Sequence, residues 1–301
     1  MTTRRNPGIL TGMPFMAHVA PRTFVDSRGH KVFLAGTPRR IVSLAPSLTE
    51  ILYAIGAGDR VVGVTEFCDF PPDAKTKPKV GYAQPSLEAL VALKPDLVVT
   101  PTEFLKADLV TQLERLKIPL MVLASETIDE IVDHVTTLGR MLNQGPTADA
   151  VAMSIRQRVA DVKAAVQGAT PVRVLYVLNS QPLITVGPKS FIDQLITSAG
   201  GSNIAGDSAE AYPRLSLEAV LQRDPEVLLF PTGKAEGVAE REQQTWRRWD
   251  RMSAVKHDRL RQIPADLLNR PGPRVADGIE QLAALLHPER FGAPPRRPEA
   301  P

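Results

Sequence analysis

The chain has 301 residues, of which 43% are hydrophobic and 23% are charged, enough for one large apolar core or two moderate ones. The net charge of +3 comes from scattered Lys and Arg with few aromatic residues beside them, which argues against a nucleic-acid-binding protein. No run approaches the roughly 20 apolar residues that span a bilayer, and Cys68, as the single cysteine, excludes an internal disulfide or a cysteine-based metal cluster.

Residues 1–22 predict a leader, and ordered structure is expected from residue 23. Arg4 and Arg5 precede a patchy apolar stretch over residues 9–16, a pattern that amounts to a degenerate secretory signal. A disordered leader is the simpler interpretation. Residues 24–33 then alternate as a β-hairpin that turns at Arg28-Gly29.

Residues 23–145 predict a first α/β lobe. Residues 40–44 form a short apolar strand bounded by Pro46, and the spacing from Ser47 to Glu50 predicts a capping box that starts a helix. Glycines at positions 56 and 58 end that helix, and residues 61–64 form the next strand. Strand, helix and strand in this order are typical of a parallel sheet.

Residues 169–290 predict a second lobe of the same kind, with a strand at 172–178 and a helix at 190–199 that Gly200-Gly201 closes. Between the lobes, apolar residues recur at steps of three or four over 147–166, so we expect one connecting helix within 146–168. A helix of about 20 residues is about 30 Å long, enough to run along both lobes. The proline-rich residues 291–301 predict a disordered tail.

One segment occurs twice, 130 positions apart. Ser86-Leu87-Glu88-Ala89 returns as Ser216-Leu217-Glu218-Ala219. In each copy a tyrosine, Tyr82 or Tyr212, lies six residues before the glutamate, and prolines follow it after seven and thirteen residues. Two similar units predict two similar lobes, and two lobes predict a cleft between them for a ligand.

Several spaced motifs follow one another in a recognisable order. They are residues 40–52, the Asp69-Phe70-Pro71-Pro72 loop, residues 86–98, Asn269-Arg270-Pro271-Gly272-Pro273-Arg274 and Leu286-His287-Pro288-Glu289. This pattern, from about residue 23 to 291, resembles the substrate-binding proteins of vitamin B12 and ferric-siderophore ABC importers. The resemblance implies an α/β fold with two Rossmann-like lobes of mostly parallel strands, joined by one long interdomain helix, with the ligand cleft between the lobes.

The resemblance also implies a monomeric periplasmic protein that delivers a small-molecule ligand to a permease dimer at the membrane. It implies no enzyme activity, no cofactor and no metal site. The residues agree, since the chain has no Gly-rich phosphate loop, no nucleophile elbow and no histidine pair at metal-ligand spacing.

The repeated glutamates, Glu88 and Glu218, each lie two residues after a serine that can cap a helix. At this position the helix dipole stabilises a carboxylate. Stabilising the helix is one interpretation of this position. The resemblance implies another, in which the two carboxylates pair with arginines on the two permease subunits.

The repeated tyrosines, Tyr82 and Tyr212, fall where vitamin B12-binding relatives carry pocket tryptophans, and Phe67 falls at a pocket tyrosine. The simpler interpretation is that these rings pack on their own lobe. Asp266 and Arg270 match an acid and an arginine that, in the vitamin B12-binding relatives, contact the amide side chains of the corrin. Their spacing also fits an ordinary i,i+4 ion pair.

These predictions point to a protein that binds cobalamin or a related corrinoid. A ferric-siderophore or haem binder is the alternative within the same class. A cytosolic corrinoid-handling protein or enzyme that reuses the fold is the alternative from another class, favoured by the weak export signal.

Overall fold

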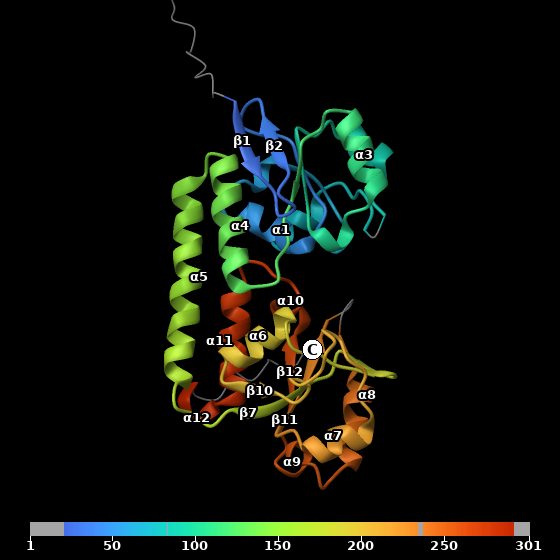
Figure 1. The fold of residues 1–301 in the computed structure, drawn as a ribbon, viewed down its shortest axis with the longest axis vertical. Helices are drawn as coiled ribbons and strands as arrows, with labels where there is room; N and C mark the ends of the chain where they lie inside the picture. Colours follow the sequence, from blue (N-terminus) through green and yellow to red (C-terminus); the bar gives the residue numbers. More distant parts are fainter. Residues whose placement is uncertain (1–20, 83, 234–236, 292–301) are drawn as a thin grey trace, which may run out of the picture.

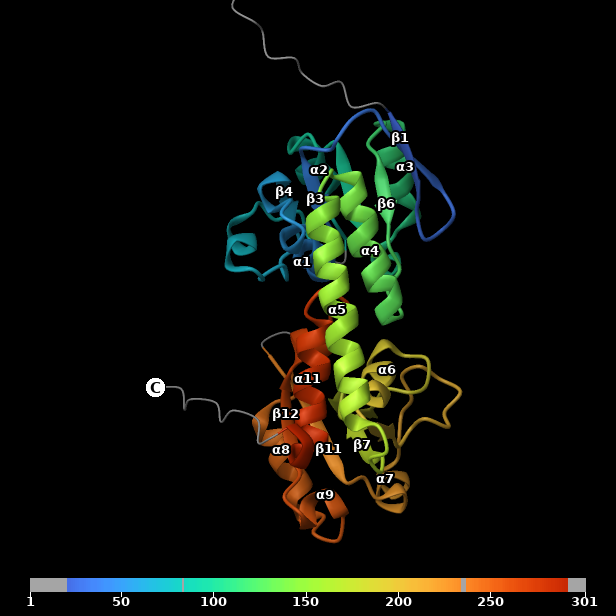
Figure 2. The ribbon, with the colours of Figure 1, turned by 90° about the vertical axis from the view of Figure 1, so that its left-hand side faces the viewer.

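The computed structural model describes residues 21–82, 84–233 and 237–291. They form two α/β lobes, one above the other in Figure 1, and the long helix α5 (Gly145–Val166) runs along one side of both. Figure 2 shows α5 in front, passing from the upper lobe to the lower one. The predicted two-lobed α/β fold with a single connecting helix is therefore confirmed.

The N-terminal lobe carries a parallel sheet in the order β4-β3-β5-β6. Its strands are β3 (Ile41–Ser43), β4 (Val61–Val64), β5 (Leu97–Thr100) and β6 (Leu120–Val122). An antiparallel hairpin of β1 (Arg22–Val25) and β2 (Lys31–Leu34) precedes the sheet, and Gly29 makes its turn with a φ of 80°. The helices are α1 (Pro46–Ala54), α2 (Leu87–Ala92), α3 (Ala107–Arg115) and α4 (Ile128–Met141), with short 3-10 helices at Gly58–Arg60, Pro72–Thr76 and Thr102–Phe104.

The C-terminal lobe repeats this topology, with a parallel sheet in the order β10-β7-β11-β12. In both lobes the second strand lies outside the first, and the third and fourth follow on its other side. The strands are β7 (Val172–Tyr176), β10 (Gly201–Asn203), β11 (Val227–Thr232) and β12 (Leu260–Pro264), with a small antiparallel pair of β8 (Asn179–Ser180) and β9 (Leu183–Ile184). The helices are α6 (Phe191–Ser198), α7 (Leu217–Arg223), α8 (Glu240–Thr245), α9 (Ser253–Lys256), α10 (Ala265–Leu268), α11 (Val275–Leu286) and α12 (Pro288–Phe291), with a 3-10 helix at Trp246–Arg248.

Helix α5 packs against α4 of the first lobe and α11 of the second. Gly139 of α4 lies so close to Ala148 of α5 that an added Cβ would stand 2.2 Å from the alanine Cβ. Further along, Arg158 of α5 donates hydrogen bonds to Asp277 and Glu280 of α11, at 2.6 and 2.7 Å. One apolar core is continuous from the first lobe through α5 into the second, so the two lobes are held on a common spine.

Three expectations differ from the structure. The predicted capping box at Ser47 and Glu50 is wrong, because α1 begins at Pro46, whose ring presets the φ of a first helical residue, and no side chain caps it. Arg22, placed in the leader, is the first residue of β1 and donates to the carbonyl of Arg140 at 2.7 Å. Phe291, placed in the tail, ends α12; the rest of the predicted leader (1–20) and tail (292–301) lies outside the described residues.

Candidate functional site

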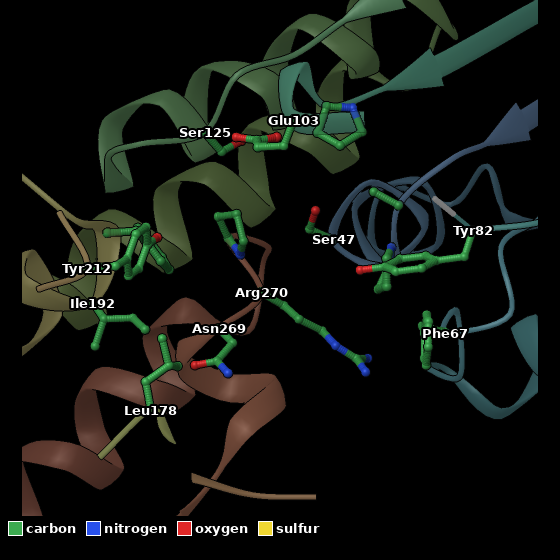
Figure 3. A pocket seen from close by; sticks show the side chains of 15 residues that line it. Ser47, Phe67, Tyr82, Glu103, Ser125, Leu178, Ile192, Tyr212, Asn269 and Arg270 are labelled. Carbon is green, nitrogen blue, oxygen red and sulfur yellow. The ribbon is translucent and has the colours of Figure 1, made fainter. Parts of the chain in front are cut away.

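A cavity of about 400 Å³ lies between the two lobes, and both lobes line it. Figure 3 shows side chains entering it from both sides, with Tyr82 and Phe67 on one wall and Tyr212 and Ile192 on the opposite one. Several lining residues follow the carboxyl ends of strands, such as Ser125 after β6 and Leu178 after β7. Parallel α/β sheets place ligands at that edge, and here the two sheets present it to the same space.

The wall from the N-terminal lobe is aromatic. Phe67, in the loop after β4, and Tyr82, in the loop before α2, meet edge to face with their ring centroids 4.3 Å apart and an interplanar angle of 78°. Such a pair fixes the orientation of both rings before a ligand arrives. Phe67 and Tyr82 therefore lie where the sequence predicted pocket residues, although their contact with a ligand stays a prediction.

The opposite wall carries Tyr212, from the loop between β10 and α7. This tyrosine exposes 56% of its surface, and it lines the cavity together with the apolar Ile192 and Leu178. A ligand that bridges the lobes can cover this ring. The duplication thus brings its two tyrosines to opposite walls of one cavity.

Arg270 extends between the two walls (Figure 3). It donates a hydrogen bond to Asp69 at 2.7 Å, and its guanidinium lies 3.1 Å from Asp266 and 3.7 Å from Glu50. Only 7% of the side chain is exposed, and its Nε has no hydrogen-bond partner among the described residues. Arg270 therefore lines the cavity and has one buried donor unused within the described residues, while its contact with a ligand stays a prediction.

Asp266 is not among the residues that line the cavity. It forms the i,i+4 ion pair with Arg270 and lies 3.8 Å from Arg274. The structure thus shows the ion pair that the spacing allowed, while the contact of Asp266 with a corrin amide stays a prediction.

Burial and hydrogen bonding move the pKa values of the neighbouring carboxyl groups in opposite directions. Burial raises the pKa of Glu50, although hydrogen bonds from Arg274 at 2.7 and 2.8 Å oppose the rise. Burial also acts to raise the pKa of Asp69, but the hydrogen bond and the charge of Arg270, with smaller contributions from the backbone N–H of Asp69 and from Lys75, together outweigh burial and lower the pKa. Asp69 is therefore ionised at neutral pH and holds the arginine by charge as well as by hydrogen bonding.

Sequence reasoning missed four polar residues that line the cavity, namely Ser47, Glu103, Ser125 and Asn269. Asn269 accepts a hydrogen bond from the hydroxyl of Tyr176 at 2.7 Å, which fixes its amide. Ser125 lies within hydrogen-bond distance of His134, 2.9 Å from its Nδ1, and burial lowers the pKa of this histidine, which favours the neutral imidazole. Ser47, Glu103 and Ser125 each follow the end of a strand within four residues, which was a usable signal, whereas the role of Asn269 depends on a distant tyrosine.

The repeated glutamates lie on the surface, one on each lobe. Glu88 and Glu218 are the second residues of α2 and α7, and both are exposed. The hydroxyls of Ser86 and Ser216 cap these helices by accepting from the backbone N–H three residues on, at 3.2 Å each. A hydrogen bond with its own backbone N–H, then one from Ser216, lowers the pKa of Glu218, which is thus an anion. Serine hydroxyls thus cap both helices, and contact of the two carboxylates with a partner stays a prediction.

Within the described ranges, no three His, Cys, Asp or Glu side chains gather closely enough to hold a metal ion. Cys68 is buried, with its sulfur 3.2 Å from the hydroxyl of Thr49 and 3.1 Å from that of Thr65. Of the helices described, none has both the length and the apolar composition to cross a membrane.

Two relatives show what this chain is similar to. The vitamin B12-binding protein of Vibrio cholerae serotype O1 is 34% identical over 255 residues, which cover 82% of this chain and 88% of that protein. An uncharacterized ABC transporter substrate-binding lipoprotein of Bacillus subtilis, YvrC, is 30% identical over 281 residues, which cover 91% of this chain and 88% of that protein.

A solved structure agrees with these relatives. The crystal structure of the periplasmic vitamin B12 binding protein BtuF of Vibrio cholerae matches with a TM-score of 0.73 at 32% identity, and the match covers 83% of this chain and 97% of that chain. A family described as periplasmic binding protein matches residues 41–267. The chain therefore belongs to the periplasmic binding protein family.

Proposed function

We propose that this protein captures cobalamin or a related corrinoid in the interlobe cavity and delivers it to the permease of an ABC importer. The observation that carries the proposal is the pairing of aromatic walls, Phe67 and Tyr82 on one lobe and Tyr212 on the other, across a single cavity. Flat rings on both walls suit the apolar faces of a broad macrocycle. The relatives named as vitamin B12-binding proteins support the same ligand.

The polar groups between the walls suit the rim of a corrin. The amide side chains of a corrin offer carbonyl acceptors to the guanidinium of Arg270. The neighbouring lining residue Asn269, whose amide is fixed by Tyr176, offers a second polar group. Capture needs no covalent step, because binding and release complete the function. A ligand held by both lobes stabilises their approach, and the packing of α5 on both lobes limits that motion.

A titration of the purified protein with cyanocobalamin tests the ligand. We expect one molecule to bind per chain by calorimetry, and the corrin absorbance to stay with the protein after desalting. Absence of binding at about 10 μM, a concentration at which a capture protein is saturated, contradicts the proposal. The same titration with haem and with ferric siderophores then separates the alternatives.

We also propose that Glu88 and Glu218 dock the protein on the two permease subunits. Both carboxylates are exposed, occupy equivalent positions on equivalent helices and follow serine caps. Charge-assisted pairs with arginine give orientation as well as affinity. Two such points, one on each lobe, fix how the cavity faces the permease.

The double variant Glu88→Lys/Glu218→Lys tests this docking in vesicles that contain the cognate permease. We expect transport to be lost while cyanocobalamin affinity stays at the wild-type value. Glu114→Lys/Glu240→Lys is the matched control, since it makes the same charge change at one exposed glutamate of each lobe. Normal transport by the first variant, or equal loss in the control, rules out this docking surface.

Export is part of the same proposal, because a permease receives its ligand from outside the cytoplasmic membrane. Fractionation of cells that produce the protein with its N-terminus intact tests it. Recovery of the full-length protein in the cytoplasm contradicts the import role and favours a corrinoid-handling protein or enzyme of the cytosol.

A further inference from the structure

Five ionisable side chains form a network across the boundary between the lobes, beside the cavity. Glu50 and Asp69 come from the N-terminal lobe, and Asp266, Arg270 and Arg274 come from the C-terminal lobe. Within this network, each ion pair that joins the two lobes is a carboxylate of the first lobe paired with a guanidinium of the second.

The innermost link joins Glu50 to Arg274, 224 positions apart in the chain. Two parallel hydrogen bonds, at 2.7 and 2.8 Å, connect them, and only 2% of the Glu50 side chain is exposed. A planar guanidinium held at two points fixes direction as well as distance. The other carboxylate of the first lobe, Asp69, is 46% exposed, so its bond to Arg270 lies nearer the solvent and exchanges more easily.

Packing around this link also crosses the boundary. The guanidinium of Arg274 lies over the ring of Phe70, 4.2 Å from its centroid. Gly272 lies against the start of α1, since a Cβ added to it would be in ordinary van der Waals contact with Ser47, 3.4 Å from its Cα. The segment from residue 269 to 274 therefore reaches from the second lobe onto the first, and it carries both arginines.

The charges explain why Glu50 matters for the cavity. Arg270 and Arg274 lie on the same short segment, and Glu50 contacts both, at 3.7 and 2.7 Å. Without Glu50, Arg270 keeps its two aspartate partners, but Arg274 keeps, among the described residues, only the longer ion pair with Asp266, at 3.8 Å. A largely buried guanidinium that has lost its close partner is costly, and movement of the segment away from the first lobe, together with Arg270, relieves that cost.

We propose that Glu50 is a positioning residue that braces the two lobes through Arg274 and keeps Arg270 in the cavity. The effect on ligand binding rests on the proposed function; the brace itself does not. Glu50 sets the spacing of the lobes before the ligand arrives, so less ordering is needed on binding.

The variant Glu50→Gln tests the brace, because it removes the charge and keeps the size. Spin labels on cysteines introduced at Thr111 and Glu242, both exposed and on different lobes, report the interlobe distance without ligand. We expect a narrow distance distribution in the parent, and a broader one shifted to longer distances in Glu50→Gln. Glu50→Asp keeps the charge and should restore part of the narrow distribution.

Glu280→Gln is the control, because Glu280 also pairs with an arginine, Arg158, but in a more exposed contact of α5 and α11 that does not include the residues lining the cavity. It should leave the distance distribution unchanged. Where the parent binds cyanocobalamin, Glu50→Gln should also raise the dissociation rate constant, about tenfold, with little change in the association rate constant.

A distance distribution in Glu50→Gln equal to that of the parent overturns the proposal. If the melting temperature falls while the distances stay unchanged, Glu50 has a role in stability alone. The distances are measured without ligand, so a parent that fails to bind cyanocobalamin refutes the corrinoid function and leaves the brace to be judged separately.

Discussion

Substitution of Tyr212 measures directly what the cavity wall contributes to ligand affinity. It is 56% exposed in the empty cavity, and a buried aromatic side chain covers about 150–250 Å², so a ligand can cover about 100 Å² of this ring. At about 25 cal per mol per Å², that area contributes about 2.5 kcal/mol. We therefore expect Tyr212→Ala to weaken cyanocobalamin binding about 70-fold.

Calorimetric titration of the variant measures this loss, and Phe33→Ala is the matched control. Phe33 lies on β2 with 59% of its surface exposed, is not among the residues lining the interlobe cavity, and undergoes a similar aromatic truncation. Its removal should leave the affinity unchanged. A loss of less than about threefold in Tyr212→Ala, or an equal loss in the control, would refute the assignment of this wall to ligand contact.

Three further predictions concern stability. Burial lowers the pKa of His134 in the folded state, so on acidification the unfolded chain is protonated first. The free energy of unfolding, relative to that of His134→Asn, should therefore fall below about pH 6.5, by at most about 1.4 kcal/mol per pH unit. A difference between the two proteins that does not change with pH in urea denaturation contradicts this. Ser216→Ala removes the cap of α7 and should cost about 1 kcal/mol without changing ligand affinity, so a titration that shows weaker binding would assign the serine a further role. Gly139→Ala should lower the free energy of unfolding by about 1–3 kcal/mol, because the added methyl group pushes α4 away from Ala148. The same change at Gly145, where an added Cβ has no atom within 4 Å, should be tolerated. Equal melting temperatures for the two variants would argue against the close helix contact.

Much of the fold could be predicted, because the sequence patterns that indicate it are local or occur twice in the chain. The turn at Gly29, the caps at Ser86 and Ser216 and the apolar spacing of α5 each depend on residues within a few positions. The 130-residue repeat then predicted two lobes of one topology, as the matching strand orders show. The start of α1 was misplaced because a spacing rule was applied to Glu50, a residue whose carboxylate a distant arginine holds.

The candidate site was predicted only where the duplication or the resemblance marked it, as for Tyr82 and Tyr212. Ser125 and Asn269 were missed because their roles depend on neighbours brought near by the fold, His134 and Tyr176. The spacing of Asp266 to Arg270 allows two arrangements, and the structure shows the ion pair, while contact of Asp266 with a ligand stays a prediction.

Two similar α/β lobes, the helix between them and the aromatic positions on each lobe could be read from the amino-acid sequence, because periodicity, helix caps and repeats are visible in short stretches of chain. Which residues meet across the boundary between the lobes depends on how the folded lobes pack. Glu50 and Arg274 are 224 positions apart, and no local pattern pairs them. Their contact exists because α5 packs on both lobes and brings the two sheet edges together, and burial then requires each charge to find its partner.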